Sequence, residues 1–359
     1  MKLIFCVTND ISYDQRMHRI AETLVDEGHD VEIVGRVLPD STTIVIQKYS
    51  QKKIRCFFQK GVSFYAEFNI RLFLYLLSKK VHLIGSIDLD TILPVYYASL
   101  LKGSKRSFDA HELFPEVPEL VGRKWIKLFW QCIEKHYMKK FPIRYTVSYS
   151  IAHFYLAKYK LKFEVIRNLP IKIEDNKKKQ KDKTEKYLFY QGALNDGRGL
   201  PEIIQAMSSV ENYTLKIAGE GDLSNSLRAL AINLNLSDRI EFLGKINPND
   251  LRSYTDGASI GLNLLENKGL SYYYSLANKF FDYMHAGVPS ICMNFPEYKK
   301  VNQEFNVAVL IDELGISSIL SAISYVENHY EKMTSACTLA SVDYCWNTER
   351  EKLISLYRK

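Results

Sequence analysis

The segment Ser275–Pro289 holds the residues whose types and spacing best suit nucleotide binding. It reads Ser-Leu-Ala-Asn-Lys-Phe-Phe-Asp-Tyr-Met-His-Ala-Gly-Val-Pro. Its first residue is a typical N-cap, and the free N–H groups at such a helix start, those of Leu276, Ala277 and Asn278, attract an anion. Asp282 lies one turn beyond Asn278 on the same side, where a carboxylate suits the two hydroxyl groups of a ribose. The segment therefore predicts a helix with a diphosphate at its tip and a ribose further along.

Glycines at the ends of three predicted strands would bring the backbone close to the same ligand. Gly192, Gly219 and Gly244 each end an apolar run, and glycine permits both close approach and positive φ. A single glycine often ends a strand for structural reasons alone. Three of them at one edge of a sheet predict a ligand site there.

Arg198 adds a charge to this predicted site. It stands between two glycines, just before a predicted helix over Leu200–Met207. An arginine at a helix start supplies a cation and a fork of donors beside the free N–H groups, which suits a phosphate. A solvated arginine is the alternative.

Polar runs also follow strands of the first half. The run after the first strand contains Asn9, Asp14 and Arg16, which we take as acceptor-binding candidates; Asp14 is equally well read as a helix N-cap. Phe-Asp-Ala-His-Glu ends at Glu112 and places His111 at a strand end. We expect His111 in a cleft, and a core histidine is the alternative.

Asp88-Leu89-Asp90 has the form of a metal-binding Asp-x-Asp. We discount a metal, because Asp90 and Thr91 could cap a predicted helix over Ile92–Leu101. Elsewhere, no His/Cys cluster has the spacing of zinc ligands. We keep Asp90 as an acceptor-binding candidate.

Apolar strands and helical patterns alternate along both halves of the chain, which indicates an α/β fold with parallel sheets. Strands are expected at Leu3–Thr8, Val31–Val34, Val81–Gly85, Arg106–Asp109, Tyr145–Ser148, Glu164–Arg167, Tyr187–Tyr190, Thr214–Ala218, Ile240–Leu243, Ser259–Leu264, Ser290–Met293 and Val307–Ile311. We expect a first domain over 1–170, a charged linker over 171–186, a second domain over 187–340, and a C-terminal helix within 341–359 that packs on the first domain. Ligands in such folds bind at the carboxyl ends of the strands.

The second half resembles the second domain of family-4 glycosyltransferases, on four motifs in order. These are Tyr190-Gln-Gly-Ala-Leu-Asn-Asp-Gly-Arg-Gly199, Leu215-Lys-Ile-Ala-Gly-Glu-Gly221, Ile240-Glu-Phe-Leu-Gly244 and Asn278-Lys-Phe-Phe-Asp-Tyr-Met-His-Ala-Gly-Val-Pro289. The resemblance implies a retaining enzyme of the GT-B fold, in which two Rossmann-like domains face each other across a cleft. It implies a UDP- or GDP-sugar as substrate, with no cofactor and no metal.

The resemblance also assigns roles. His111, Arg198 and Asp282 are the implied catalytic residues, and the backbone near Leu243 matches the base pocket. Acceptor-binding candidates are Asn9, Asp14, Arg16, Asp90 and Glu112. Donor-binding candidates are Gly192, Arg198, Gly219, Glu220, Leu243, Tyr274, Ser275, Leu276, Ala277, Asn278, Lys279 and Asp282.

Three departures from the family pattern bear on the donor site. Asp282 replaces a glutamate, Tyr274 stands where the glutamate that touches the donor sugar is expected, and Ala193 replaces an arginine. Glu266, or a backbone N–H near Ser275, is the candidate replacement for the missing glutamate. Tyr274 also favours the main alternative function, a catalytically inactive nucleotide-sugar-binding protein.

Charge is unevenly placed along the chain. Residues 1–168 carry 26 Lys+Arg and 17 Asp+Glu, a net charge of +9, whereas the remainder carries 22 and 24, a net charge of −2. The basic, aromatic stretch Gly122–Tyr137 suits an anionic membrane surface, and a core helix with a solvated basic face is the alternative. The net charge alone suggests nucleic acid, but no nucleic-acid-binding motif accompanies it.

Six scattered cysteines fit a reducing compartment, and no apolar run is long enough for a signal peptide or a membrane span. We therefore expect a cytoplasmic protein, peripheral at the inner face of the membrane. Its expected function is to transfer a hexose-type sugar to a glycan or lipid-linked glycan in surface-polysaccharide biosynthesis.

Overall fold

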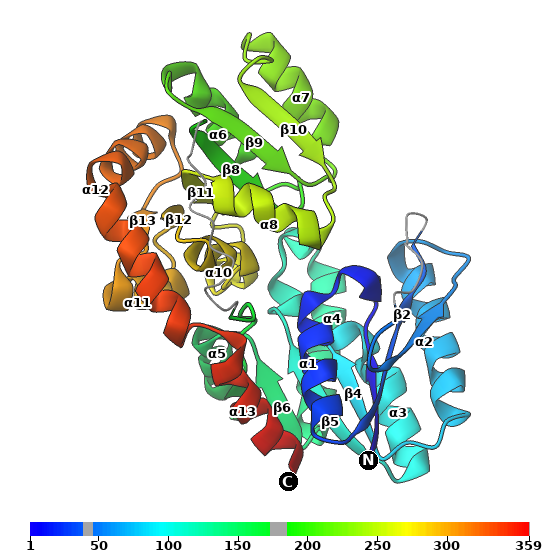
Figure 1. The fold of residues 1–359 in the computed structure, drawn as a ribbon. Helices are drawn as coiled ribbons and strands as arrows, with labels where there is room; N and C mark the ends of the chain where they lie inside the picture. Colours follow the sequence, from blue (N-terminus) through cyan, green and yellow to red (C-terminus); the bar gives the residue numbers. More distant parts are fainter. Residues whose placement is uncertain (39–45, 173–184, 359) are drawn as a thin grey trace. The chain divides into compact units, whose positions relative to one another are not determined.

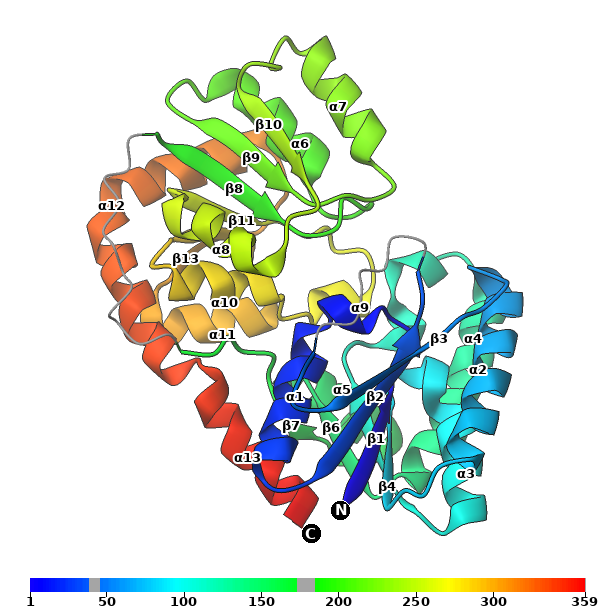
Figure 2. The same ribbon diagram turned by 45° about the vertical axis from the view of Figure 1, so that its right-hand side comes forward.

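A computed structural model describes residues 1–38, 46–172 and 185–358. Most of the predicted linker, residues 173–184, lies outside the described residues. The chain divides into two units, Met1–Asn168 with Glu349–Lys359, and Leu169–Thr348. Each contains one parallel sheet with helices on both faces, so the predicted α/β fold class is confirmed (Figures 1 and 2).

The sheet of the first unit has the order β3-β2-β1-β4-β5-β6-β7, and every pair of neighbours is parallel. Its strands are β1 (Lys2–Cys6), β2 (Asp30–Arg36), β3 (Ser50–Ile54), β4 (Leu83–Ile87), β5 (Lys105–Ala110), β6 (Ile143–Thr146) and β7 (Glu164–Val165). Its helices are α1 (Gln15–Asp26), α2 (Gly61–Leu77), α3 (Ile92–Lys102), α4 (Lys124–Tyr137), α5 (Tyr149–Tyr159) and most of α13 (Trp346–Arg358).

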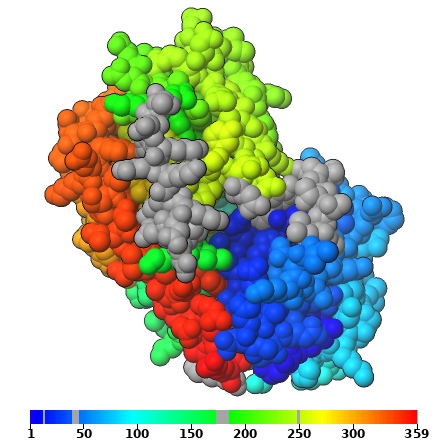
Figure 3. Space-filling view, in the orientation of Figure 1, coloured from blue at the N-terminus to red at the C-terminus, as the bar shows by residue number. Residues whose placement is uncertain are grey.

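The C-terminal helix α13 packs on the first unit. Tyr357 Oη lies 3.0 Å from Tyr145 Oη and donates to Ser107 Oγ at 3.0 Å. Glu349 is buried and binds Arg167 at 2.8 Å. Glu27, at the end of α1, pairs with two arginines of α13, and the space-filling view shows the end of the chain against its beginning (Figure 3). Helix α13 therefore completes the cover of the sheet beside α1.

The sheet of the second unit has the order β10-β9-β8-β11-β12-β13. Its strands are β8 (Tyr187–Gln191), β9 (Thr214–Ala218), β10 (Ile240–Gly244), β11 (Ile260–Asn263), β12 (Ser290–Met293) and β13 (Ala308–Ile311). Its helices are α6 (Leu200–Ala206), α7 (Ser224–Asn233), α8 (Pro248–Gly257), α9 (Leu270–Tyr273), α10 (Asn278–His285), α11 (Pro296–Phe305) and α12 (Ile316–Asp343).

The ring of Tyr283 packs directly over Gly261 and fixes helix α10 on this sheet. A Cβ on Gly261 would lie 2.3 Å from the Tyr283 ring, so only glycine leaves room for it. Tyr283 is buried and donates its hydroxyl to Phe189 O at 2.9 Å. The packing holds the polar residues of α10 at a set height above the carboxyl ends of β8 and β11.

All twelve expected strands are present, with ends shifted by up to two residues, and β3 was not predicted. Strand β3 lies at the edge of the sheet and its sequence, Ser-Gln-Lys-Lys-Ile, is polar with a buried residue only at its end. A solvated edge strand needs no apolar run, so the pattern that reveals central strands is absent there. Among the described residues, no helix is long and apolar enough to cross a membrane.

Candidate functional site

The loops after β8, β9 and β10 lie against one another at the carboxyl edge of the second sheet. Gly192 N–H donates to Ala218 O at 2.9 Å, and Gly219 N–H donates to Gly244 O at 2.8 Å. A Cβ on Gly219 would lie only 1.9 Å from Gly192 O. Gly192, Gly219 and Gly244 all have positive φ. The three predicted glycines are therefore brought together, and they make the floor of the candidate site from backbone alone.

Leu243 and Glu220 lie at the outer end of this floor. The pairing of β10 with β9 shifts register between Phe242 and Gly244, so Leu243 is the bulged residue. A bulge leaves its extra residue unpaired in the ladder. Glu220 pairs with Arg228 at 3.0 Å, and this carboxylate is therefore already partly neutralised.

Arg198 stands in a turn that two glycines make possible. Gly197 and Gly199 have φ of 76° and 64°, and Gly199 is the N-cap of α6. The guanidinium carbon of Arg198 lies 4.9 Å from the centre of the Tyr272 ring. Its Nε is buried and makes no hydrogen bond within the part of the chain that the structure describes. The arginine is held by stacking, and donors of its fork stay available to a ligand.

Lys279, at the first turn of α10, is a buried basic residue. Its side chain is 7% exposed, and Nζ lies 3.8 Å from the centre of the Tyr190 ring. Burial, and then the charge of Arg198, lower the pKa of Lys279 well below its usual range. Within the described ranges, neither Lys279 nor Arg198 has a carboxylate in an ion pair.

Buried cations are normally paired. The aromatic face under Lys279 supplies part of the missing stabilisation. An anion placed between Arg198 and Lys279 would supply the rest, and the two phosphates of a nucleoside diphosphate carry the matching charge.

Asp282 is oriented by a chain of hydrogen bonds. Gln191 donates from Nε2 to Asp282 Oδ2 at 2.7 Å, and Thr255 donates from Oγ1 to Gln191 Oε1 at 2.9 Å. Gln191 and Thr255 are both buried. The amide therefore faces the carboxylate with its NH₂ group and fixes the orientation of Asp282.

The predicted anion-binding helix tip is wrong in part. The N-cap of α10 is Ala277, and it makes no side-chain capping bond, so Ser275 does not cap the helix. Ala277 N–H donates to the hydroxyl of Tyr298 at 3.0 Å, and Leu276 is buried in the core. Buried Tyr298 reaches this turn from α11 and takes the N–H that the sequence assigned to a phosphate. The N–H group of Ala277 is therefore already engaged within the protein, and Lys279 at the same turn is the remaining predicted donor-binding residue with a positive charge to offer.

Tyr274 and Glu266 do not supply the missing glutamate. Tyr274 ends α9 with its ring 5.3 Å from that of Tyr273. Glu266 pairs with Lys268 at 2.9 Å, and Lys268 also pairs with Asp196. The proposed compensation by Glu266 is therefore unsupported, because its carboxylate is neutralised within its own loop.

In the first unit, His111 lies in a network of charges at the carboxyl edge of the sheet. His111 Nε2 lies 3.0 Å from Asp109 Oδ2, and its backbone N–H donates to Asp88 Oδ1 at 2.8 Å. Burial alone would lower the pKa of His111, but the carboxylates of Asp109 and Asp88 outweigh it and raise that pKa to about 9. At neutral pH the imidazole is therefore a cation and a hydrogen-bond donor. His111 is partly exposed rather than a core histidine, and its place in a cleft stays a prediction.

Arg16 takes a different role from the predicted one. Its side chain is 2% exposed, and its guanidinium donates to both oxygens of Asp109 and to Ile166 O. An acceptor at the surface cannot reach it, so we correct its assignment to positioning the Asp109 carboxylate beneath His111. Asp14 accepts from Met17 N–H as the N-cap of α1, which bears out the structural alternative for that residue.

Asp88 and Asp90 follow β4 and lie near His111 at the carboxyl edge of the sheet. Asp88 has φ of 56° and ψ of −178°, a strained conformation for a residue with a side chain. Its backbone N–H donates to Asp109 O. Asp90 is buried, accepts from Thr8 Oγ1 through Oδ2, and leaves Oδ1 without a partner among the described residues. Burial raises the pKa of Asp90 to about 6.

Asp90 does not cap α3, whose N-cap is Thr91 without a side-chain bond. Its Oδ1 is a buried acceptor without a partner among the described residues, and it would accept from a ligand hydroxyl that reached it. Asn9 is exposed at the same edge, where its carbonyl accepts from Arg36 N–H. Glu112 follows His111 and is half-buried. These three remain acceptor-binding candidates.

Replacing Asp88 by asparagine should lower the pKa of His111 from about 9 toward the usual value of about 6.5. The side-chain amide of asparagine still offers an oxygen to the backbone N–H of His111. It removes one of the two carboxylate charges that stabilise the imidazolium. An NMR titration of the ring protons measures the shift. Asp30→Asn, on the exposed start of β2, is the control. An unchanged titration in Asp88→Asn would show that Asp88 does not set the charge of His111.

The chain is similar to known proteins in its second unit and in its fold. Residues 171–337 match the family model described as "Glycosyl transferases group 1". Similar solved structures include sucrose-phosphate synthase from Thermosynechococcus elongatus, with 15% identity, a TM-score of 0.79, and coverage of 100% of this chain and 98% of that one. HepE of Anabaena in complex with UDP and glucose has 12% identity, a TM-score of 0.77, and full coverage of both chains. WaaG, a glycosyltransferase involved in lipopolysaccharide biosynthesis, has 14% identity, a TM-score of 0.72, and 98% coverage of each chain.

No curated protein sequence matches the chain. The structural likenesses establish the GT-B fold, and the family match over the second unit supports glycosyl transfer.

Proposed function

We propose that the protein is a retaining glycosyltransferase that moves a sugar from a UDP- or GDP-sugar to a glycan or lipid-linked glycan in surface-polysaccharide biosynthesis. It works in the cytoplasm at the inner face of the membrane and needs neither metal nor cofactor. The observation that carries the proposal is a pair of basic side chains, Arg198 and Lys279, beside the oriented carboxylate of Asp282; neither makes an ion pair with a carboxylate among the described residues.

Lys279 takes the place of the arginine that the family resemblance leads one to expect at position 193. Its Nζ lies 3.5 Å from where a Cβ on Gly192 would stand, next to Ala193. The glycine floor lets a diphosphate lie close to the backbone there. The base lies toward the bulge at Leu243, and Asp282 accepts from the ribose hydroxyls.

In the proposed reaction the bond between the sugar's anomeric carbon and the diphosphate oxygen breaks, and the acceptor oxygen bonds to that carbon on the same face. The transition state has oxocarbenium character. The acceptor proton passes to the departing diphosphate oxygen. Arg198 and Lys279 stabilise the charge that develops on that diphosphate, which is where preorganised cations lower a barrier most.

His111 suits the role of a hydrogen-bond donor in this scheme. The carboxylates of Asp109 and Asp88 keep it charged at neutral pH, so it cannot accept the acceptor's proton. We infer that the imidazolium donates to a hydroxyl of the donor sugar or to the leaving diphosphate. Asp90, whose Oδ1 has no partner in the described ranges, is the group proposed to bind the acceptor hydroxyl.

A screen of nucleotide sugars tests the proposal. A ligand bound only by the folded state raises thermal stability, so the donor is identified by the largest shift in melting temperature. Release of nucleoside diphosphate from that donor, increased by a glycan acceptor, is the expected result. Binding without turnover on any donor and acceptor pair would instead favour the inactive nucleotide-sugar-binding protein that Tyr274 suggests.

Replacing Asp282 by alanine should weaken the binding of UDP or GDP by about 10- to 100-fold, because charge-assisted hydrogen bonds to the ribose are each worth about 1.5–3 kcal/mol. The affinity for inorganic pyrophosphate, which has no ribose, should not change. Calorimetry measures both. Asp256→Ala, on the exposed side of α8, is the matched control. An equal loss for pyrophosphate and for the nucleotide would contradict the ribose assignment.

A further inference from the structure

The outer face of α4 carries an apolar stripe that none of the described residues of its own unit covers. Trp125, Leu128, Phe129 and Cys132 recur at helical spacing and are all exposed, and Trp125 is 85% exposed. The opposite face of α4 buries Trp130, Ile133 and Glu134. A helix with apolar stripes on two opposite faces packs one of them against the core. The other is exposed, and such a face is typical of a surface that contacts a partner.

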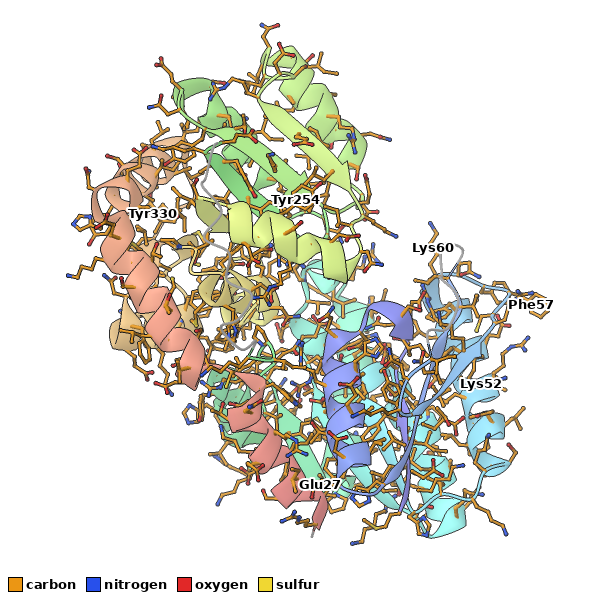
Figure 4. The ribbon with its side chains drawn as sticks, in the orientation of Figure 1. Glu27, Lys52, Phe57, Lys60, Tyr254 and Tyr330 are labelled. Atoms are coloured by element: carbon orange, nitrogen blue, oxygen red, sulfur yellow. The ribbon has the colours of Figure 1, made fainter. Side chains whose placement is uncertain are left out.

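A second exposed aromatic segment connects β3 to α2. Phe57 is 85% exposed, and Phe58 and Val62 are also exposed. The Glu67 carboxylate accepts the N–H groups of Phe57 and Phe58 at 2.9–3.0 Å, so the backbone holds both rings outward. Figure 4 shows Phe57 and Lys60 pointing away from this connection.

The two segments belong to one edge of the first unit. Both α2 and α4 follow strands of a parallel sheet, so both begin at its carboxyl edge. They also touch, because the rings of Tyr65 on α2 and Trp130 on α4 pack edge to face at 5.6 Å. His111 and Asp90 lie at the same edge, at the ends of β5 and β4.

Cations surround these apolar side chains. Arg123, Lys124, Lys135 and Lys139 are exposed along α4 and its ends, and Lys52, Arg55 and Lys60 flank the connection from β3 to α2. The nearby acidic groups are Glu116, which pairs with Lys127, Glu119, and Glu67, which binds Arg71. Aromatic rings between lysines and arginines match the boundary of an anionic bilayer, where rings enter the interface and cations meet headgroup phosphates.

The geometry points to a membrane-docking surface formed by the outer face of α4 and the connection from β3 to α2, with an anionic lipid bilayer as its partner. We choose a bilayer over a second copy of the chain on charge complementarity, because two copies of a basic surface repel each other. The inference extends the proposed function: it would hold the acceptor edge of the first unit against the membrane that carries a lipid-linked acceptor.

Sedimentation with vesicles tests the inference without donor or acceptor. We expect the full chain to bind vesicles of phosphatidylcholine containing phosphatidylglycerol, and to bind vesicles of phosphatidylcholine alone much more weakly. The double variant Trp125→Ser/Phe129→Ser should lose about tenfold or more in vesicle affinity, because each ring contributes buried apolar area. Lys124→Gln should weaken binding to the mixed vesicles and reduce its dependence on salt.

The control is Ile232→Ser/Leu339→Ser, which removes exposed apolar side chains of the second unit and should bind vesicles as the unaltered chain does. Transfer to a soluble acceptor should be unchanged in all these variants, which separates failure of docking from failure of the proposed reaction. Absence of vesicle binding, or an equal loss in the control, would overturn the inference. So would a concentration-dependent dimer that Trp125→Ser/Phe129→Ser abolishes, since the surface would then be an interface between copies.

Discussion

Replacing Lys279 by methionine should weaken the binding of a nucleoside diphosphate by about 30- to 150-fold, which corresponds to about 2–3 kcal/mol. The ammonium group lies on the Tyr190 ring beside Gly192 and has no carboxylate in an ion pair among the described residues. A diphosphate would be its counter-ion, and methionine cannot replace that charge. Calorimetric titration with UDP and GDP measures the loss.

The same change should leave the free protein as stable as before, or more stable. Methionine has a similar volume and no charge to desolvate, whereas burial disfavours the charged lysine in the unliganded protein. Urea unfolding therefore distinguishes a binding residue from a structural one. Lys299→Met, on the exposed face of α11, should change neither binding nor stability. Loss of stability without loss of affinity in Lys279→Met would show that this lysine supports the fold alone.

Replacing Arg16 by methionine should destabilise the protein by about 3–5 kcal/mol, the cost of leaving a buried charge without its partner. Asp109 is fully buried and receives two hydrogen bonds from Arg16, at 2.9 and 3.0 Å. Denaturant unfolding of the whole chain measures the loss. Arg71→Met, which breaks an exposed pair with Glu67 one turn away, should cost far less, because solvent screens exposed charges.

The loss of unfolding free energy in Arg16→Met, relative to the unaltered protein, should become smaller as the pH falls. Arg16 and His111 hold the pKa of Asp109 below its usual range against the opposing effect of burial. A carboxylate with a lowered pKa stabilises the fold above the pKa of its unfolded state, and that contribution is lost as the pH falls through the folded value. Without Arg16, burial favours the neutral acid, so protonation relieves the buried charge. A deficit that stays constant with pH would contradict the role of this ion pair.

The parallel strands were the most predictable part of the fold. Buried strands such as β9, Thr214–Ala218, show as short apolar runs, because both faces of the sheet are covered. Strand β3 lacks that pattern because it is solvated at the sheet edge. The glycines at 192, 219 and 244 also follow from sequence, since a floor built from backbone requires them.

The roles of the side chains depend on contacts between segments that are far apart in the sequence. A local sequence pattern cannot predict such contacts. The sequence gives no sign that Tyr298 takes the N–H of Ala277, 21 residues away, or that Arg16 crosses 93 residues to bind Asp109. Gln191 and Thr255, which orient Asp282, were missed for the same reason. Lys279 is among the predicted donor-binding residues, but no role was assigned to its charge, although it is a lone cation before two phenylalanines in a chain that has Ala193 in place of an arginine.

The central claim is that Arg198 and Lys279 bind the diphosphate of a nucleotide sugar. Calorimetry of the unaltered protein with UDP and GDP, against UMP and GMP, tests it in two buffers of different ionisation enthalpy. The diphosphates should bind at least about tenfold more tightly, because a second charged phosphate meets a second cation. Binding should also take up a proton above the lowered pKa of Lys279, since the ligand restores the charged amine. Equal affinities for mono- and diphosphates, with no proton uptake, would contradict the account.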